Sequence, residues 1–150
     1  MCNCDEEKGK YNQPGKPSVK GEGQVVDSTK HSGTAYIKNG WGTILTTLTL
    51  RHRRSNDPDK QEEKTWYSVT PQQECTMSFT YETGAASPFD YWWVSFVTVA
   101  GQTWTCKGNF YCSVASEDEA WAKLVIDGGS GEMTVSFSKS SGCYVGLSKS

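Results

Sequence analysis

The side chains best suited to chemistry in this chain are aromatic residues that directly follow a polar one. Two such groups occur between positions 90 and 111: Asp90, Tyr91 and Trp92, and then Asn109, Phe110 and Tyr111. A sugar offers an apolar C–H face to an aromatic ring, and its hydroxyls bind to a carboxylate or an amide. These six residues, with Trp41 in a predicted turn, therefore form the predicted ligand site. A structural alternative stays open, in which Asp90 only begins a strand and the tryptophans lie in the core.

The same aromatic residues also suit a membrane surface, because Tyr and Trp prefer the interface between lipid and water. On this interpretation an exposed cluster of Trp92, Phe110 and Tyr111, with Trp41, inserts among lipid headgroups. Three neighbouring arginines, Arg51, Arg53 and Arg54, would assist on anionic lipid. We therefore expect the partner to be a glycan or a lipid headgroup.

An enzyme needs positioned acids, bases or nucleophiles, and we find no such set. His31 and His52 are the only imidazoles, and no GxSxG, HExxH or phosphate-loop motif occurs. We interpret His52 as a hydrogen-bonded edge residue. Cys2 and Cys4 lack a second ligand pair, and the Asn56–Asp59 loop lacks EF-hand spacing. We predict no catalytic residue, no metal and no cofactor.

Composition limits the function classes further. The chain has 150 residues, which suits one domain, and its net charge of −2 gives no electrostatic reason to bind nucleic acid. No apolar run reaches the length of about 18 residues that a transmembrane helix needs. The start, MCNCDEEKGK, is polar from its second residue and does not read as a signal peptide. We expect a cytoplasmic protein, leaderless secretion, or a secreted chain whose signal peptide was removed.

The elements that must position the site are strands. The aromatic run from Tyr91 to Val99 is apolar on both faces, and Ala100-Gly101 turns it into a return strand over 102–107. Because Trp92 and Trp93 are adjacent, they face opposite ways. We expect Trp93 to lie in the core and Trp92 to face a ligand.

Alternating patterns predict further strands along the chain, and no segment predicts a convincing helix. We expect about eight or nine mainly antiparallel strands in a single all-β sandwich. Residues 33–150 form this domain, and residues 1–32, which have almost no apolar content, form a flexible polar arm with a possible short strand at 24–27. The charged run from Lys60 to Lys64 is interpreted as a surface loop.

Four of the six cysteines fall within the predicted domain. Cys106 and Cys112 flank a short loop and could form a disulfide in an oxidising environment. Cys75 and Cys143 are expected to be buried thiols.

Three segments, GTAYIKNGWGTILTTLTLRHRRSNDP, WYSV and FDYWWVSF, resemble a small domain family of fungi and nematodes named for up-regulation in long-lived nematode mutants. The resemblance covers Gly33 to the C-terminus and implies an all-β fold. More remotely, YIKNG and PFDYWW resemble the actinoporin-type sandwich, which fungal fruit-body lectins share with sea-anemone pore formers. That resemblance implies an aromatic cluster for lipid. Residues 1–32 do not match the amphipathic N-terminal helix of actinoporins, so pore formation is not implied.

These observations predict a non-enzymatic defence protein of lectin or cytolysin type that binds through an exposed aromatic cluster. The alternative is a structural or storage protein that self-associates, as a homo-oligomer, through exposed β edges.

Overall fold

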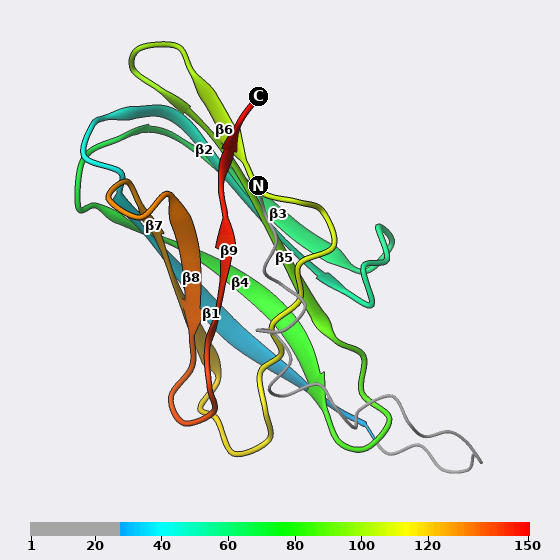
Figure 1. The fold of residues 1–150 in the computed structure, drawn as a ribbon. Coiled ribbons are helices and arrows are strands. Elements are labelled where there is room, and N and C mark those ends of the chain that lie inside the picture. Colours follow the sequence, from blue (N-terminus) through cyan, green and yellow to red (C-terminus); the bar gives the residue numbers. More distant parts are fainter. Residues whose placement is uncertain (1–27) are drawn as a thin grey trace.

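The computed structural model describes residues 28–150 and contains two five-stranded β-sheets packed face to face (Figure 1). The first sheet has the order β4-β1-β7-β8-β9, and the second has the order β10-β6-β5-β2-β3. The strands are β1 (Thr29–Gly40), β2 (Leu45–Arg54), β3 (Gln61–Val69), β4 (Glu74–Thr83), β5 (Asp90–Thr98), β6 (Thr103–Thr105), β7 (Trp121–Asp127), β8 (Glu132–Ser136), β9 (Cys143–Gly146) and β10 (Ser148–Lys149). The predicted all-β sandwich is confirmed.

Strand β1 lies inside the first sheet, between β4 and β7. It pairs antiparallel with β4 and parallel with β7, and the other pairs are antiparallel. It begins at Thr29, four residues before the domain start expected at Gly33. The possible strand at 24–27, and the predicted arm up to residue 27, lie outside the described residues.

Strand β3 corrects the prediction of a charged loop at Lys60–Lys64. These charges belong mostly to an edge strand, which begins at Gln61 and pairs only with β2. An edge strand leaves one row of backbone groups unpaired, and charged side chains there discourage pairing with another chain. The charges that predicted a loop are therefore compatible with a strand.

The core lies between the sheets, and alternate residues of each strand enter it. On β5 these residues are Trp92, Val94 and Phe96, which are fully buried, while Trp93 is half-buried on the outer face. This is the reverse of the expectation for Trp92 and Trp93. Their neighbours on β2 decide the direction, because Leu50 pairs with Val94 and points inward.

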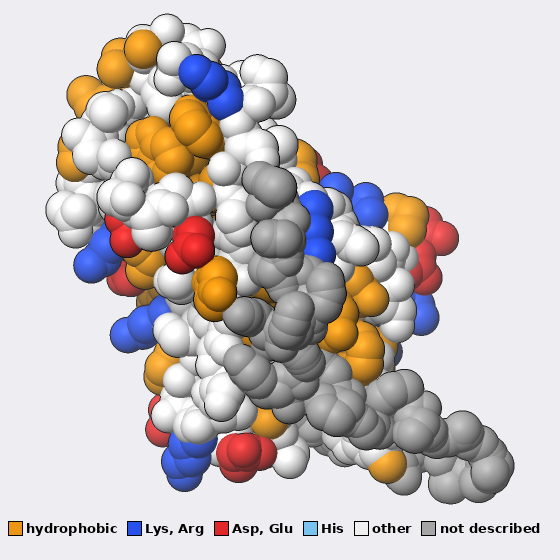
Figure 2. Space-filling model, viewed as in Figure 1, with side chains coloured by type: hydrophobic (Ala, Val, Ile, Leu, Met, Phe, Trp, Pro, Cys, Tyr) orange, Lys and Arg blue, Asp and Glu red, His pale blue; other side chains and the backbone are white. Residues whose placement is uncertain are grey.

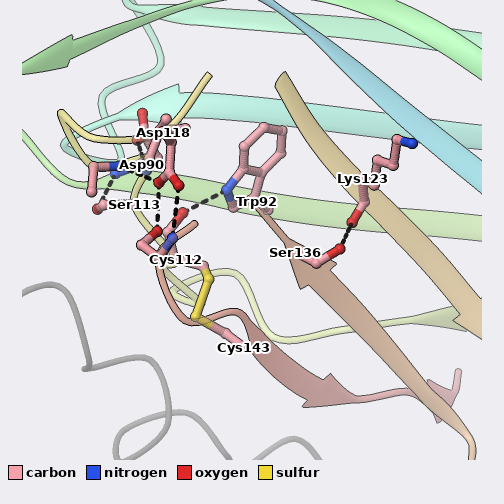
Figure 3. Close-up of a disulfide and its surroundings, with 11 residues drawn as sticks. Asp90, Trp92, Cys112, Ser113, Asp118, Lys123, Ser136 and Cys143 are labelled. Atoms are coloured by element: carbon pink, nitrogen blue, oxygen red, sulfur yellow. Dashed lines mark hydrogen bonds between the residues drawn. A yellow bond between two sulfur atoms is a disulfide. The ribbon is translucent and has the colours of Figure 1, made fainter. Parts of the chain in front are cut away.

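The disulfide joins Cys112 to Cys143, with a Cα–Cα distance of 6.1 Å, so the expected pair of Cys106 and Cys112 is wrong. Cys143 begins β9 of the first sheet, and Cys112 follows the loop after β6. Figure 3 shows the bond beside Trp92, whose indole Nε1 donates to the Cys112 carbonyl at 2.9 Å. The bridge therefore fastens the 106–116 connection to the other sheet. Cys75 is a buried thiol, as expected, whereas the expected thiol at Cys143 is wrong because Cys143 is in the disulfide.

The surface is mixed in character. On the face seen in Figure 2, hydrophobic side chains form separate groups between polar ones, and both charge signs occur. Within residues 28–150, there is no helix long and apolar enough to cross a membrane.

Candidate ligand-binding face

The outer face of the second sheet carries two aromatic residues beside two arginines. Antiparallel pairing sets Tyr91 opposite Arg53 and Trp93 opposite Arg51. Directly opposed residues in such a pair lie on the same face, with Cβ atoms about 5 Å apart. All four side chains are half-buried. We call Tyr91, Trp93, Arg51 and Arg53 the arginine–aromatic face.

Each arginine is held in place by uncharged partners. The guanidinium carbon of Arg51 lies 4.7 Å from the centroid of the Trp93 ring, which is a cation–π contact. Arg53 donates from Nε to Gln61 Oε1 at 2.7 Å and from Nη1 to Asn56 Oδ1 at 3.4 Å. These contacts orient the two cations without neutralising them.

A tight turn after β2 borders this face. Ser55 and Asn56 both adopt the left-handed conformation, with φ of 55° and 53°. Such a conformation is costly for residues other than glycine and persists where neighbours hold it. Asn56 is held by Arg53 on one side and donates to the Gly108 carbonyl at 3.3 Å on the other. The turn therefore connects the end of β2 to the loop that carries Asn109.

Further aromatic rings and a hollow continue the border. Tyr111 forms an isolated β-bridge with Tyr91, and the two rings are 5.6 Å apart. Tyr111 also stacks on Phe89 at 4.9 Å. A hollow of about 310 Å³ adjoins Phe89 and is lined by Ser55, Ala86, Ser87, Pro88 and Phe89. Another, of about 360 Å³, is lined by residues of the 83–87 and 113–116 segments.

The structure removes three predicted residues from any exposed site. Asp90, Trp92 and Phe110 are each 0% exposed, so the expectation that they reach a ligand is wrong. Asp90 and Trp92 fall on the inward parity of β5. The Phe110 backbone carbonyl accepts from the Trp92 backbone N–H at 3.1 Å, and the Phe110 side chain lies in the core.

The other four predicted residues separate into two places. Tyr91, Tyr111 and the exposed Asn109 lie at the arginine–aromatic face or its border. Trp41 instead packs on Phe96 and Trp104, each at 4.9 Å. Phe96 is five residues from Tyr91 along β5, so Trp41 contacts this strand about 17 Å away from Tyr91. Trp93, Arg51 and Arg53 were missed as glycan-site residues, although the alternation of β2 and β5 places them on one face.

Asp90 instead takes part in a triad with the buried His52 and the partly exposed Glu62. His52 is fully buried, and its Nε2 lies 2.8 Å from Asp90 Oδ1 while its Nδ1 lies 2.7 Å from Glu62 Oε1. Ionised carboxylates only accept hydrogen bonds, so both ring nitrogens donate and the ring is an imidazolium. His52 was predicted to be a hydrogen-bonded residue at the edge of the sheet. Its edge position is wrong, because its strand β2 lies between β5 and β3.

The electrostatics of the triad follow from these contacts. Burial alone lowers the pKa of His52, but the hydrogen bonds and charges of Asp90 and Glu62 outweigh it and raise the pKa above its usual value. The rings of Phe79 and Trp92 flank the imidazole at 4.8 and 4.6 Å. With both nitrogens engaged and no exposure, His52 holds β2, β3 and β5 together and offers no base to a substrate in this arrangement.

No family model matches this chain, and none of the curated proteins compared with it matches either. The two family resemblances stay predictions.

Proposed function

We propose that this protein is a lectin-type binding module that holds a saccharide on the arginine–aromatic face. The observation that carries the proposal is the position of Trp93 and Tyr91, two residues apart on the outer face of β5 and half-buried. A ring fixed in this way supplies a rigid apolar platform at a low cost in side-chain entropy.

Polar groups around the platform suit sugar hydroxyls. Next to the aromatic pair, Ser95 on β5 lies opposite Thr49 on β2, and Thr49 lies opposite Thr65 on β3. Asn109 is exposed on the loop after β6, beside the Asn56 turn. A saccharide needs both an apolar platform and donors or acceptors at its edges, and the outer face offers both.

The lipid alternative has its own location. The largest exposed aliphatic side chains among the described residues are Val99 at 60% and Ile44 at 42%. They are neighbours, since the Val99 backbone N–H donates to the Ile44 carbonyl at 3.0 Å. These residues lie toward the Trp41 end of the sheet, away from Tyr91. Lipid binding is therefore expected to respond to changes at Val99, and saccharide binding to changes at Trp93.

Self-association through the β3 edge is less well supported. This edge carries Glu62, Glu63 and Lys64, and charges at an edge oppose pairing between chains.

The test is a glycan array followed by titration calorimetry, with liposome pelleting beside it. We expect Trp93→Ala to weaken saccharide binding about tenfold or more. Trp121→Ala is the matched control, because Trp121 is a half-buried tryptophan on the first sheet with Lys123 over its ring at 5.1 Å. Equal loss with both variants, or an array without a binder, would refute the proposal.

A further inference from the structure

The two cations of the arginine–aromatic face form no salt bridge within the described residues. Ion pairs in residues 28–150 join His52 to Glu62, His52 to Asp90 and Arg54 to Glu82. Arg51 and Arg53 take part in none of them. Arg54, on the same strand, contrasts with them because its Nη1 lies 2.7 Å from Glu82 Oε2.

The charged groups near Arg51 leave a positive balance. Burial and the charge of Arg53 lower the pKa of Arg51, and the charge of Glu63 raises it. Glu63 is the residue opposite Arg51 on β3, while Gln61 is opposite Arg53 and Tyr91 and Trp93 lie on the other side. Two guanidiniums therefore face one carboxylate, and an added anion would relieve their repulsion.

The spacing also suits a ligand with regularly placed acid groups. Arg51 and Arg53 are two residues apart on one strand, which separates their backbones by about 7 Å. Each has an aromatic ring directly opposite on β5. A guanidinium offers a planar set of donors that fits a carboxylate or a sulfate, and the ring beside it accepts the apolar face of a sugar.

We propose that the arginine–aromatic face takes an acidic saccharide, a sugar chain whose carboxylate or sulfate groups bind to Arg51 and Arg53 while its rings stack on Trp93 and Tyr91. This inference rests on the proposed saccharide-binding function and names the class of ligand.

The experiment compares pairs of ligands that share a sugar backbone and differ in charge. Oligogalacturonate and its methyl ester share one backbone, and the ester lacks the carboxylates. A heparin fragment and its desulfated form, which keeps the uronate carboxylates, isolate the contribution of sulfate. In titration calorimetry with the full chain, we expect oligogalacturonate to bind at least about tenfold more tightly than its neutral methyl ester, or the sulfated fragment at least about tenfold more tightly than its desulfated form. Raising the salt concentration should reduce that difference.

Variants assign the effect to the two arginines. Arg51→Gln and Arg53→Gln should each weaken binding of the acidic form far more than binding of the neutral form, and so remove most of the preference. Arg51→Lys keeps the charge and should retain part of the preference. Lys123→Gln is the matched control, because Lys123 is a cation over the Tyr36 and Trp121 rings of the other sheet, and it should change nothing. Circular dichroism checks that each variant folds.

The possible outcomes distinguish the saccharide-binding function from the acidic class of its ligand. Equal binding of acidic and neutral forms, with Trp93→Ala weakening both, would overturn the acidic class and keep the saccharide function. A preference that Lys123→Gln abolishes as strongly as Arg51→Gln would overturn the assigned site. Binding to phosphatidylserine vesicles, with none to any saccharide, would overturn both.

Discussion

The triad of His52, Asp90 and Glu62 makes the free energy of unfolding depend on pH in a definite direction. His52 has a raised pKa in the folded protein, because two carboxylates hold its charged form. In the unfolded chain its pKa returns to about 6.5. The stabilisation is therefore fully present below about pH 6.5 and is lost as the pH rises through the folded-state pKa.

Asp90→Asn tests how much this arrangement contributes. Asp90 Oδ1 accepts from His52, and its Oδ2 accepts from the Val114 N–H at 3.0 Å. An amide places an NH₂ group against one of these two donors, and the imidazolium loses a buried counter-charge. Removing one partner of a buried pair costs about 3–5 kcal/mol. The matched control is Asp59→Asn, the same change on an exposed turn, which should stay within about 0.5 kcal/mol.

The assay is urea unfolding followed by tryptophan emission at a series of pH values, with NMR of the imidazole protons. The chain has two histidines, so His31→Gln assigns the His52 signals. We expect unfolding free energy to fall on the alkaline side for the unmodified chain, and the His52 pKa to drop in Asp90→Asn. Stability that does not change with pH, together with equal effects of Asp90→Asn and Asp59→Asn, would refute a charged triad.

Three further tests address the packing and the disulfide. Trp92→Ala should destabilise the fold by about 3–5 kcal/mol, whereas Trp93→Ala on the outer face should cost about 1 kcal/mol; urea midpoints in the reverse order would contradict the assigned faces. Cys143→Ser opens a disulfide that spans 31 residues, and we expect a loss of about 3–4 kcal/mol, with a thermal midpoint that no longer responds to reductant. A Cβ at Gly128 would lie 2.3 Å from a backbone carbonyl of the β1–β2 turn, while one at Gly108 meets nothing within 4 Å. Gly128→Ala should therefore lower stability by about 1–3 kcal/mol, and Gly108→Ala should not reproduce that loss in thermal melts.

Local patterns predicted the strands because alternation reports which residues share a face. Cys75, Met77, Phe79 and Tyr81 predicted β4, and all four are buried. The same logic failed on β5, where both parities are apolar and neither face is favoured by the strand itself. The deciding information was on β2, where His52 shares the inward parity of Leu48 and Leu50.

The alternation of apolar and polar residues could not predict contacts between residues far apart in the chain. His52 and Asp90 are 38 residues apart, and only the register of β2 against β5 brings them together. The disulfide was mispredicted for the same reason, since proximity in sequence favoured Cys106 while the sandwich placed Cys143 beside Cys112. Predicting the arginine–aromatic face also required the register of β2 against β5, although the alternation on each strand was visible in the sequence.

The place of β1 in the first sheet has a consequence for synthesis of the chain. β1 leaves the ribosome before every other described strand. One of its edges nevertheless stays unpaired until β7 is made, because β7 pairs with β1 and sets Trp121 opposite Thr34. Parallel pairing across such a sequence distance closes late and slowly. We expect nascent chains halted before β7 to remain sensitive to protease, and chains that extend beyond the C-terminal residue by a ribosome-tunnel length to become resistant. Resistance already present before β7 emerges would show that β1 and β4 form a stable unit by themselves.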